Sequence, residues 1–110
     1  MKVIIVRPLE EPVATEIENG LIPMQELVGG YIQAVYPFEE PVALICNEEA
    51  KLLGLPLNRA LRTETGEIYD IIAGTFLLCG APPDSDHFTD LTQEQVETLL
   101  LRFRRPELFL

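Results

Sequence analysis

Short apolar runs separated by turn signals follow one another along the chain, and their lengths predict strands more often than helices. Residues 2–6, KVIIV, are apolar on both sides, which is typical of a central strand. Residues 13–18 alternate between apolar or β-branched and polar positions, the pattern of a half-buried strand. The Asn19-Gly20 turn signal ends this second run. We therefore expect residues 2–18 to form a hairpin.

Two further strands are predicted on either side of a stiff, proline-flanked loop. They are YIQAVY at 31–36 and VALIC at 42–46, both rich in aromatic or β-branched residues. The polar stretch from Asn47 to Ala50 is typical of a type I turn. This turn is expected to return the chain into residues 51–53 as a hairpin.

The longest apolar run, residues 68–79, follows a turn signal at Thr65-Gly66. It is too long for one flat strand without interruption. Gly74 interrupts it and predicts either a bulge or a close approach of another segment to the backbone.

Two helices are predicted. Residues 23–28 form a short one, which begins at a proline and ends at a glycine pair suited to a left-handed cap. A capping box of Thr92 and Gln95 begins an amphipathic helix over 93–104. We predict a single globular domain, residues 1–110, of the α+β class: mainly antiparallel sheet of five or six strands, with one short helix and one C-terminal amphipathic helix.

The net charge of the chain limits which kinds of molecule it is expected to bind. The 110 residues include 18 acidic and 8 basic side chains, a net charge of -10. Proteins that bind nucleic acid directly need a basic surface for the phosphates, so direct nucleic-acid binding is disfavoured. The N-terminal apolar run is too short for a signal peptide or a membrane span, which predicts a cytoplasmic protein without a membrane partner.

No motif for catalysis, cofactor or metal binding is visible, so we expect neither a cofactor nor a metal. Cys46 and Cys79 end apolar runs and are interpreted as buried thiols, with the distance between them left open. His87 lies in an acidic loop without partners for a catalytic role. An enzyme is therefore the least favoured class of function.

Five polar residues form the candidate binding site. Asn58 and Arg59 interrupt an apolar octapeptide, where an arginine fork could hold a carboxylate or phosphate and the amide could orient it. Tyr69 could stack on a ligand, and Asp70 interrupts an apolar strand. Asn47, on the predicted turn, completes the set.

The structural alternative for Arg59 is an ion pair across the Thr65-Gly66 turn with Asp70 or Glu67. Such a pair would hold the hairpin together and leave no group for a ligand. This alternative is the one that we favour from the residues alone.

The run from Gly29 to Gly80 resembles the family known as domain of unknown function 3846. The resemblance lies in GGYI at 29–32, in Asn47-Glu48-Glu49, in GLP with NRA at 54–60, and in YDI with GTF at 69–76. Relatives usually carry glycine where this chain has Ala50. The resemblance implies a bacterial, phage or mobile-element context and no catalytic residues, because the family has no established activity.

Two function classes follow. The first is a non-enzymatic protein-interaction module of a mobile element or phage-related locus, which would present the 47–61 region and an acidic surface to an unidentified protein partner. It predicts that Asn58 and Arg59 are exposed. The second is a small-ligand binder for a nucleotide or another anion, which predicts a concave pocket around the same side chains. The apolar tail, 108–110, and the 46–53 hairpin also suggest a homodimer.

Overall fold

The computed structural model describes residues 1–109, which form two helices and seven strands. In chain order the elements are β1 (Lys2–Val6), β2 (Val13–Glu16), α1 (Leu21–Val28), β3 (Ile32–Val35), β4 (Val42–Asn47), β5 (Leu57–Arg62), β6 (Ile68–Ala73), β7 (Phe76–Gly80) and α2 (Gln93–Arg102). The predicted α+β class, with an antiparallel sheet and a C-terminal helix, is confirmed.

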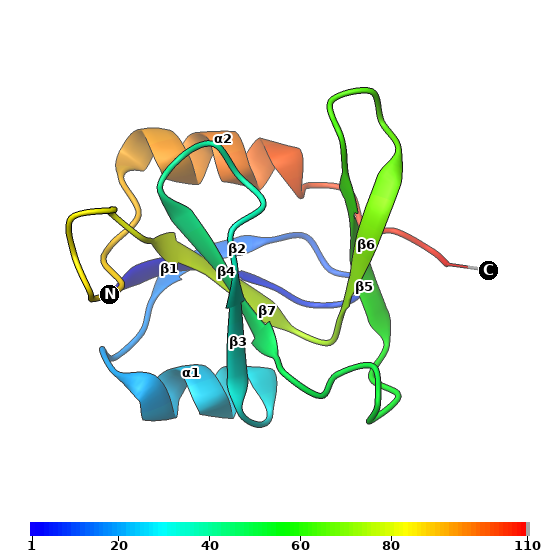
Figure 1. Ribbon diagram of the computed structural model, residues 1–110, viewed down its shortest axis with the longest axis horizontal. Helices are drawn as coiled ribbons and strands as arrows, with labels where there is room; N and C mark the ends of the chain where they lie inside the picture. Colours follow the sequence, from blue (N-terminus) through cyan, green and yellow to red (C-terminus); the bar gives the residue numbers. More distant parts are fainter. Residues whose placement is uncertain (110) are drawn as a thin grey trace.

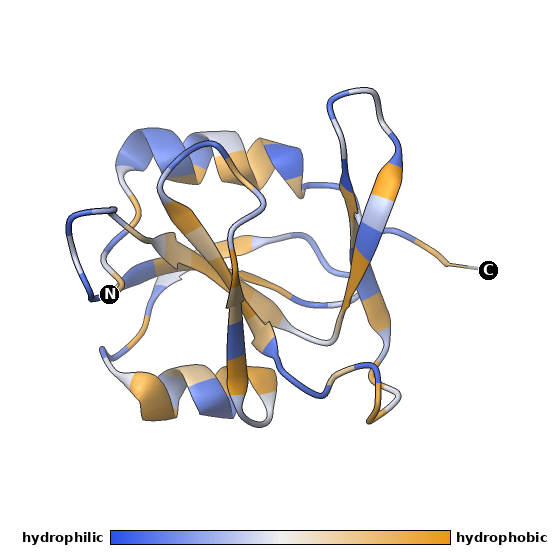
Figure 2. Cartoon of the chain, viewed as in Figure 1, coloured by the Kyte–Doolittle hydropathy of each residue, from blue (hydrophilic) through white to orange (hydrophobic). Residues whose placement is uncertain are grey.

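Five strands form the main sheet, in the order β2-β1-β7-β4-β3, and every neighbouring pair is antiparallel. The three central strands carry the most continuous apolar sequence, and Figure 2 shows them mainly in orange. Strands buried on both faces need such runs, because neither face meets water. The expectation that residues 2–6 form a central strand is confirmed.

The helices cover opposite faces of the main sheet (Figure 1). The α1 face contains a core of eight buried residues: Val3, Ile5, Met24, Val28, Ala43, Ile45, Leu77 and Cys79. The α2 face contains Ile4, Val6, Val42, Leu44, Cys46, Leu61, Ile72, Phe76, Leu78, Leu91, Val96, Leu99 and Phe103. Since β5 and β6 contribute Leu61 and Ile72 to the second core, their hairpin packs on the α2 face beside the helix.

The predicted helix caps are confirmed, whereas the helix limits differ. α1 ends at Gly29, whose φ of 80° is left-handed. It begins at Leu21, so Pro23 stands in the third helical position, where a missing N–H still costs no helical hydrogen bond. The capping box of α2 is formed, and this helix ends at Arg102 rather than at 104. Neither helix within residues 1–109 is long and apolar enough to cross a membrane.

The hairpin between residues 2 and 18 is confirmed, with β2 ending at Glu16. The predicted hairpin through residues 46–53 is wrong. β4 pairs with β3 and β7, and residues 48–54 form consecutive turns instead of a returning strand. Ala50 accepts this geometry because the turn from Asn47 needs no left-handed residue there.

Gly74 divides the long apolar run into β6 and β7, which belong to different sheets. Its φ of +75° suits glycine, and a Cβ there would come within 2.9 Å of the Leu55 side chain. The predicted close approach at Gly74 is therefore confirmed. The strands number seven because β5 and β6 form a separate two-stranded sheet, seen at the right of Figure 1.

Candidate functional site

Asn58 and Arg59 lie on β5, where the pairing with β6 shifts register between Leu57 and Arg59. A bulge of this kind places one extra residue in a strand and re-aims its side chains. Both polar side chains consequently enter the protein, and their exposed fractions are 0% and 1%. The expectation that Asn58 and Arg59 are exposed is wrong.

The Arg59 guanidinium binds backbone carbonyl groups rather than a carboxylate. It donates from Nε and one terminal nitrogen to the Phe103 carbonyl oxygen, at 3.2 and 3.1 Å. The same terminal nitrogen donates to the Glu10 carbonyl oxygen at 2.6 Å. Burial lowers the pKa of this guanidinium, an effect that the charge of Glu107 opposes. Arg59 thereby joins β5 to the end of α2 and to the β1–β2 loop.

Asn58 completes the same buried network. Its amide nitrogen donates to the carbonyl oxygens of Val6 and Gly74, at 2.9 and 2.8 Å. Its side-chain oxygen accepts a hydrogen bond of 2.8 Å from Arg59. Three of the four bonds that the amide can make are thus formed within the chain. This arrangement holds the hairpin on the main sheet and supports a structural role for both residues.

Asp70 binds Lys51 and does not bind Arg59. The carboxylate lies 2.8 Å from the Lys51 ammonium and also accepts the backbone N–H of Ile71 at 2.8 Å. The hydrogen bond from Lys51 lowers the pKa of Asp70, as do the Ile71 N–H and the lysine charge, and these effects outweigh burial. The predicted pairing of Arg59 with Asp70 or Glu67 is therefore wrong.

Asn47 holds the end of α1 against β4. Its amide nitrogen donates to the Val28 carbonyl oxygen at 3.1 Å, and its oxygen accepts the Glu49 N–H at 2.8 Å. The side chain is buried. Gly30 leaves room for this amide, because a Cβ there would lie 3.0 Å from the Asn47 amide nitrogen, closer than ordinary van der Waals contact.

Tyr69 is the candidate residue whose side chain lies free on the surface. It lines a hollow of about 290 Å³ between the β5–β6 hairpin and the end of α2, together with Arg62 and Arg102. Arg62 is bound by Glu107 at 2.7 Å, and Arg102 lies over the Phe38 ring at 4.8 Å. Both arginines of this hollow thus already have partners within the chain.

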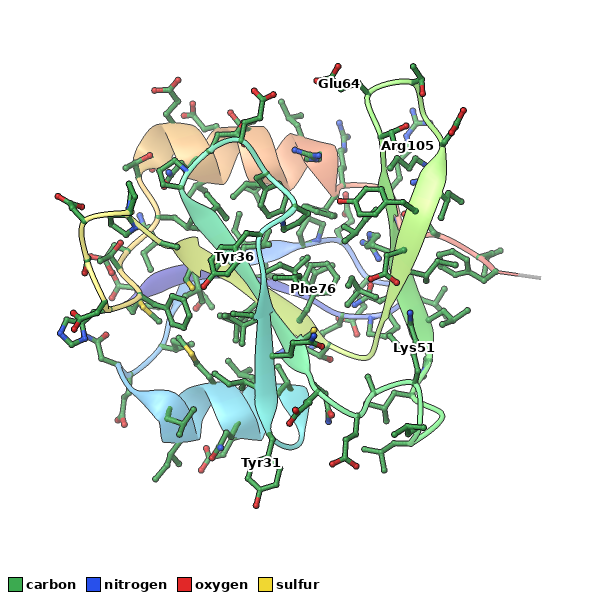
Figure 3. The ribbon with its side chains drawn as sticks, viewed as in Figure 1. Tyr31, Tyr36, Lys51, Glu64, Phe76 and Arg105 are labelled. Atoms are coloured by element: carbon green, nitrogen blue, oxygen red, sulfur yellow. The ribbon has the colours of Figure 1, made fainter. Side chains whose placement is uncertain are left out.

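A second hollow, of about 160 Å³, lies beside β6 and is called here the β6 hollow. It is lined by Gln33, Val35, Cys46, Asn47, Glu48, Glu49, Ala50, Lys51, Leu52, Asp70, Ile71, Ile72 and Ala73. Asn47 and Asp70 therefore meet at one place, whereas Asn58 and Arg59 lie outside it. Figure 3 shows the Lys51 side chain, which lies on the loop between β4 and β5, pointing towards β6.

Sequence reasoning missed three residues that line these two hollows: Lys51 and Leu52 in the β6 hollow and Glu107 in the hollow beside Tyr69. The two adjacent leucines at 52 and 53 favour the returning strand of a hairpin. The Gly-Leu-Pro that follows them, a typical turn segment, was the signal that the strand does not form. Glu107 had no local signal, since its partners are more than forty residues away.

Glu107 fixes the segment after α2 to the outer edge of β5. One carboxylate oxygen accepts the backbone N–H of Ala60 at 3.1 Å, and the other binds Arg62. In the apolar tail, residues 108–110, Leu108 is exposed and Leu110 lies outside the described residues. The tail is therefore attached through Glu107.

Replacing Glu107 with glutamine is expected to lower the free energy of unfolding by about 1 kcal/mol at neutral pH. Burial raises the pKa of Glu107, but the bonds from Arg62 and Ala60 and the two arginine charges lower it below its usual value. A lowered pKa stabilises the fold above the unfolded value of about 4.3, and this contribution is lost as pH falls further. The difference between wild type and variant, measured by urea unfolding, should shrink below pH ~4. A difference independent of pH would contradict this.

The two cysteines lie on opposite faces of the main sheet, Cys46 in the α2 core and Cys79 in the α1 core. Both thiols are buried and free. Burial raises the pKa of Cys79 to about 12, and burial, followed by the charge of Asp70, raises that of Cys46 against the opposing charge of Lys51. Neither thiol is prepared to act as a nucleophile at neutral pH. No group of three metal-ligating side chains occurs within residues 1–109.

These contacts define a small α+β protein in which two buried polar residues, Asn58 and Arg59, hold a separate hairpin against the main sheet. The chain belongs to the family described as domain of unknown function (DUF3846), whose model matches residues 1–104. No curated protein and no solved structure matches the chain. The resemblance stated from the sequence is thereby confirmed.

Proposed function

We propose that this chain is a non-enzymatic protein-interaction module whose contact surface is the loop between β4 and β5. Residues 48–56 are called here the leucine loop. The observation that carries the proposal is the exposure of two consecutive leucines, Leu52 at 87% and Leu53 at 59%. Single exposed apolar residues are ordinary, but adjacent ones at the end of a projecting loop are typical of a binding surface.

The leucine loop is held in one conformation by its own hydrogen bonds. The Leu53 N–H binds the Glu49 carbonyl oxygen at 2.9 Å, and the Leu55 N–H binds that of Ala50 at 3.0 Å. Lys51 ties the loop to β6 through Asp70. A loop that is ordered before binding loses less conformational entropy when a partner arrives, which favours affinity.

Charge supports a basic partner surface. The chain carries a net charge of -10, and the leucine loop begins with the exposed carboxylates of Glu48 and Glu49. A complementary basic surface would speed encounter and orient the partner. A module of this kind suits a cytoplasmic protein of a mobile element or phage-related locus, and we retain that context as part of the proposal.

A small-ligand function has less support. Asn58 and Arg59, the expected anchors, do not line a hollow with Tyr69 but are buried in a bonded network. The hollow that Tyr69 does line already holds an ion pair between Arg62 and Glu107. An anion that binds Arg62 there would have to displace the Glu107 carboxylate, whose bond to Ala60 also stabilises the fold.

A photo-crosslinking amino acid placed at Leu52 is expected to yield a discrete covalent adduct with a partner protein in the cells that produce the chain. The matched control is Ile22, near the start of α1, an apolar side chain that is 66% exposed. Adducts should form at position 52 and be absent at 22. The double change Leu52→Ser and Leu53→Ser should remove binding without lowering stability, because neither side chain is buried. Equal crosslinking at both positions, or none at 52, would reject the proposal.

A further inference from the structure

On each edge of the β5–β6 hairpin, a carboxylate accepts a backbone N–H that points outward: Ala60 on β5 and Ile71 on β6. Ala60 and Ile71 are opposite one another in the register, and such pairs alternate between bonding each other and pointing away. The Ala60 N–H binds Glu107 on the β5 edge, and the Ile71 N–H binds Asp70 on the β6 edge. Both therefore point away from the partner strand.

The two edges differ in how they are covered. The β5 edge is covered by a remote segment of the chain, which Glu107 attaches. On the β6 edge, Ile71 is bonded only by the carboxylate of the neighbouring residue, and within residues 1–109 no strand pairs with β6 other than β5. The β6 edge is therefore open to a further strand once the Asp70 oxygen moves aside.

The β6 hollow lies along this open edge. Residues 70–73 form one side, and Gln33 and Val35 of β3, the edge strand of the main sheet, form another. Its volume of about 160 Å³ is below the usual 300–1,000 Å³ of small-molecule pockets, so it suits one inserted side chain. Strand addition to a sheet edge uses such pockets for alternate side chains of the incoming segment.

The rim of the hollow indicates the chemistry of that segment. Leu52 offers apolar contact, while Glu48 and Glu49 are exposed and form no ion pair with another described residue. Lys51, the cation among the residues that line the hollow, is already held by Asp70. A lysine or arginine of the segment would meet the two free glutamates.

We propose that the β6 edge binds an extended, basic and apolar segment of a partner protein by strand addition. A carbonyl oxygen of the segment replaces Asp70 Oδ1 on the Ile71 N–H. The same Oδ1 binds Lys51, so the carboxylate turns away from the edge together with the flexible, exposed lysine side chain. One apolar side chain enters the β6 hollow. This inference rests on the proposed function, and it specifies which kind of segment of the partner protein binds and how. A second copy of the chain is disfavoured as the occupant because two chains of charge -10 repel each other.

The test is selection from a displayed random-peptide library on the immobilised full-length chain, followed by affinity measurements with the selected synthetic peptides. The enriched peptides should alternate β-branched or aromatic residues with lysine or arginine. Copies N-methylated on alternate backbone amides should bind at least about tenfold more weakly, the equivalent of one or two hydrogen bonds. Reversing charge with Glu48→Lys and Glu49→Lys should also weaken binding.

Two variants of one residue test the edge itself. Ile71→Pro removes the outward N–H without removing a bond to β5, and proline is tolerated at such edge positions. Ile71→Val is the matched control, which keeps the N–H and should bind as wild type does. As a measurement that needs no variant, hydrogen exchange of the Ile71 amide in the wild type should slow when a peptide binds.

Strand addition is overturned if no peptide is enriched, if peptides bind Ile71→Pro as tightly as wild type, or if Ile71 exchange is unchanged. Light scattering that shows a dimer, lost in Ile71→Pro, would also overturn it by making a second copy the occupant. Crosslinking at Leu52 separates the two proposals. An adduct there without peptide binding at β6 rejects strand addition alone, whereas the absence of both rejects the interaction module too.

Discussion

Replacing Arg59 with methionine is expected to lower the free energy of unfolding by about 3–5 kcal/mol. Methionine fills much of the same space but donates no hydrogen bond. The carbonyl oxygens of Phe103 and Glu10 and the side-chain oxygen of Asn58 would each lose a buried donor. Since small domains are stable by about 5–15 kcal/mol, this single change removes a large share of the total. Equilibrium unfolding in urea measures it.

The matched control is Arg62→Met on the same strand, because that guanidinium is partly exposed and has one carboxylate partner. We expect this variant to lose about 1 kcal/mol or less. Arg59→Lys should recover only part of the loss, since an ammonium group cannot span carbonyl groups on two segments as a planar fork does. An Arg59→Met variant as stable as Arg62→Met would contradict the structural role.

This expected result limits how binding experiments are designed. If a variant of Arg59 no longer binds a partner protein, the simplest cause is a loss of stability. Such a variant therefore does not show whether Arg59 contacts the partner protein. The leucine loop and the β6 edge can be changed at exposed positions such as Leu52 and Glu48, where stability is hardly affected. Variants at these positions therefore test binding without a change in stability.

The parts of the fold that could be predicted from sequence depend on local signals. The capping box of α2, the glycine cap of α1 and the turn between β1 and β2 each involve residues within a few positions of one another. The α+β class followed from the lengths and periods of the apolar runs. Local chemistry was sufficient for these elements because local contacts stabilise them.

The hairpin at Thr65-Gly66 was expected, but its separation from the main sheet could not be predicted, because that depends on distant partners. Leu52 and Leu53 look like strand residues, yet no strand is available to pair with them beside β4, whose two edges are taken by β3 and β7. The run at 68–79 likewise has no sequence signal that assigns its two halves to different sheets. Gly74 indicated the interruption but not its consequence.

The candidate site likewise combines residues that the sequence makes conspicuous with contacts that only the fold determines. Asn58 and Arg59 stand out in the sequence as unusual polar residues. Their partners, however, are 16 to 52 residues away and, in two bonds, each other. An arginine among apolar residues has the same sequence appearance whether it binds an anion or buried carbonyl groups. Only burial distinguishes the two, and burial is a property of the fold.

Replacing Asn58 with leucine, which has a similar shape, is expected to lower the free energy of unfolding by about 3–5 kcal/mol. The carbonyl oxygens of Val6 and Gly74 would lose their donors, and one Arg59 nitrogen would lose an acceptor. Urea unfolding again measures the change, with the exposed Asn19→Leu as the matched control, expected within about 0.5 kcal/mol of wild type. A stable Asn58→Leu variant that no longer crosslinks through Leu52 would return Asn58 to the binding site. If the variant is less stable but its folded form still crosslinks through Leu52, the role of Asn58 is to hold the hairpin against the main sheet.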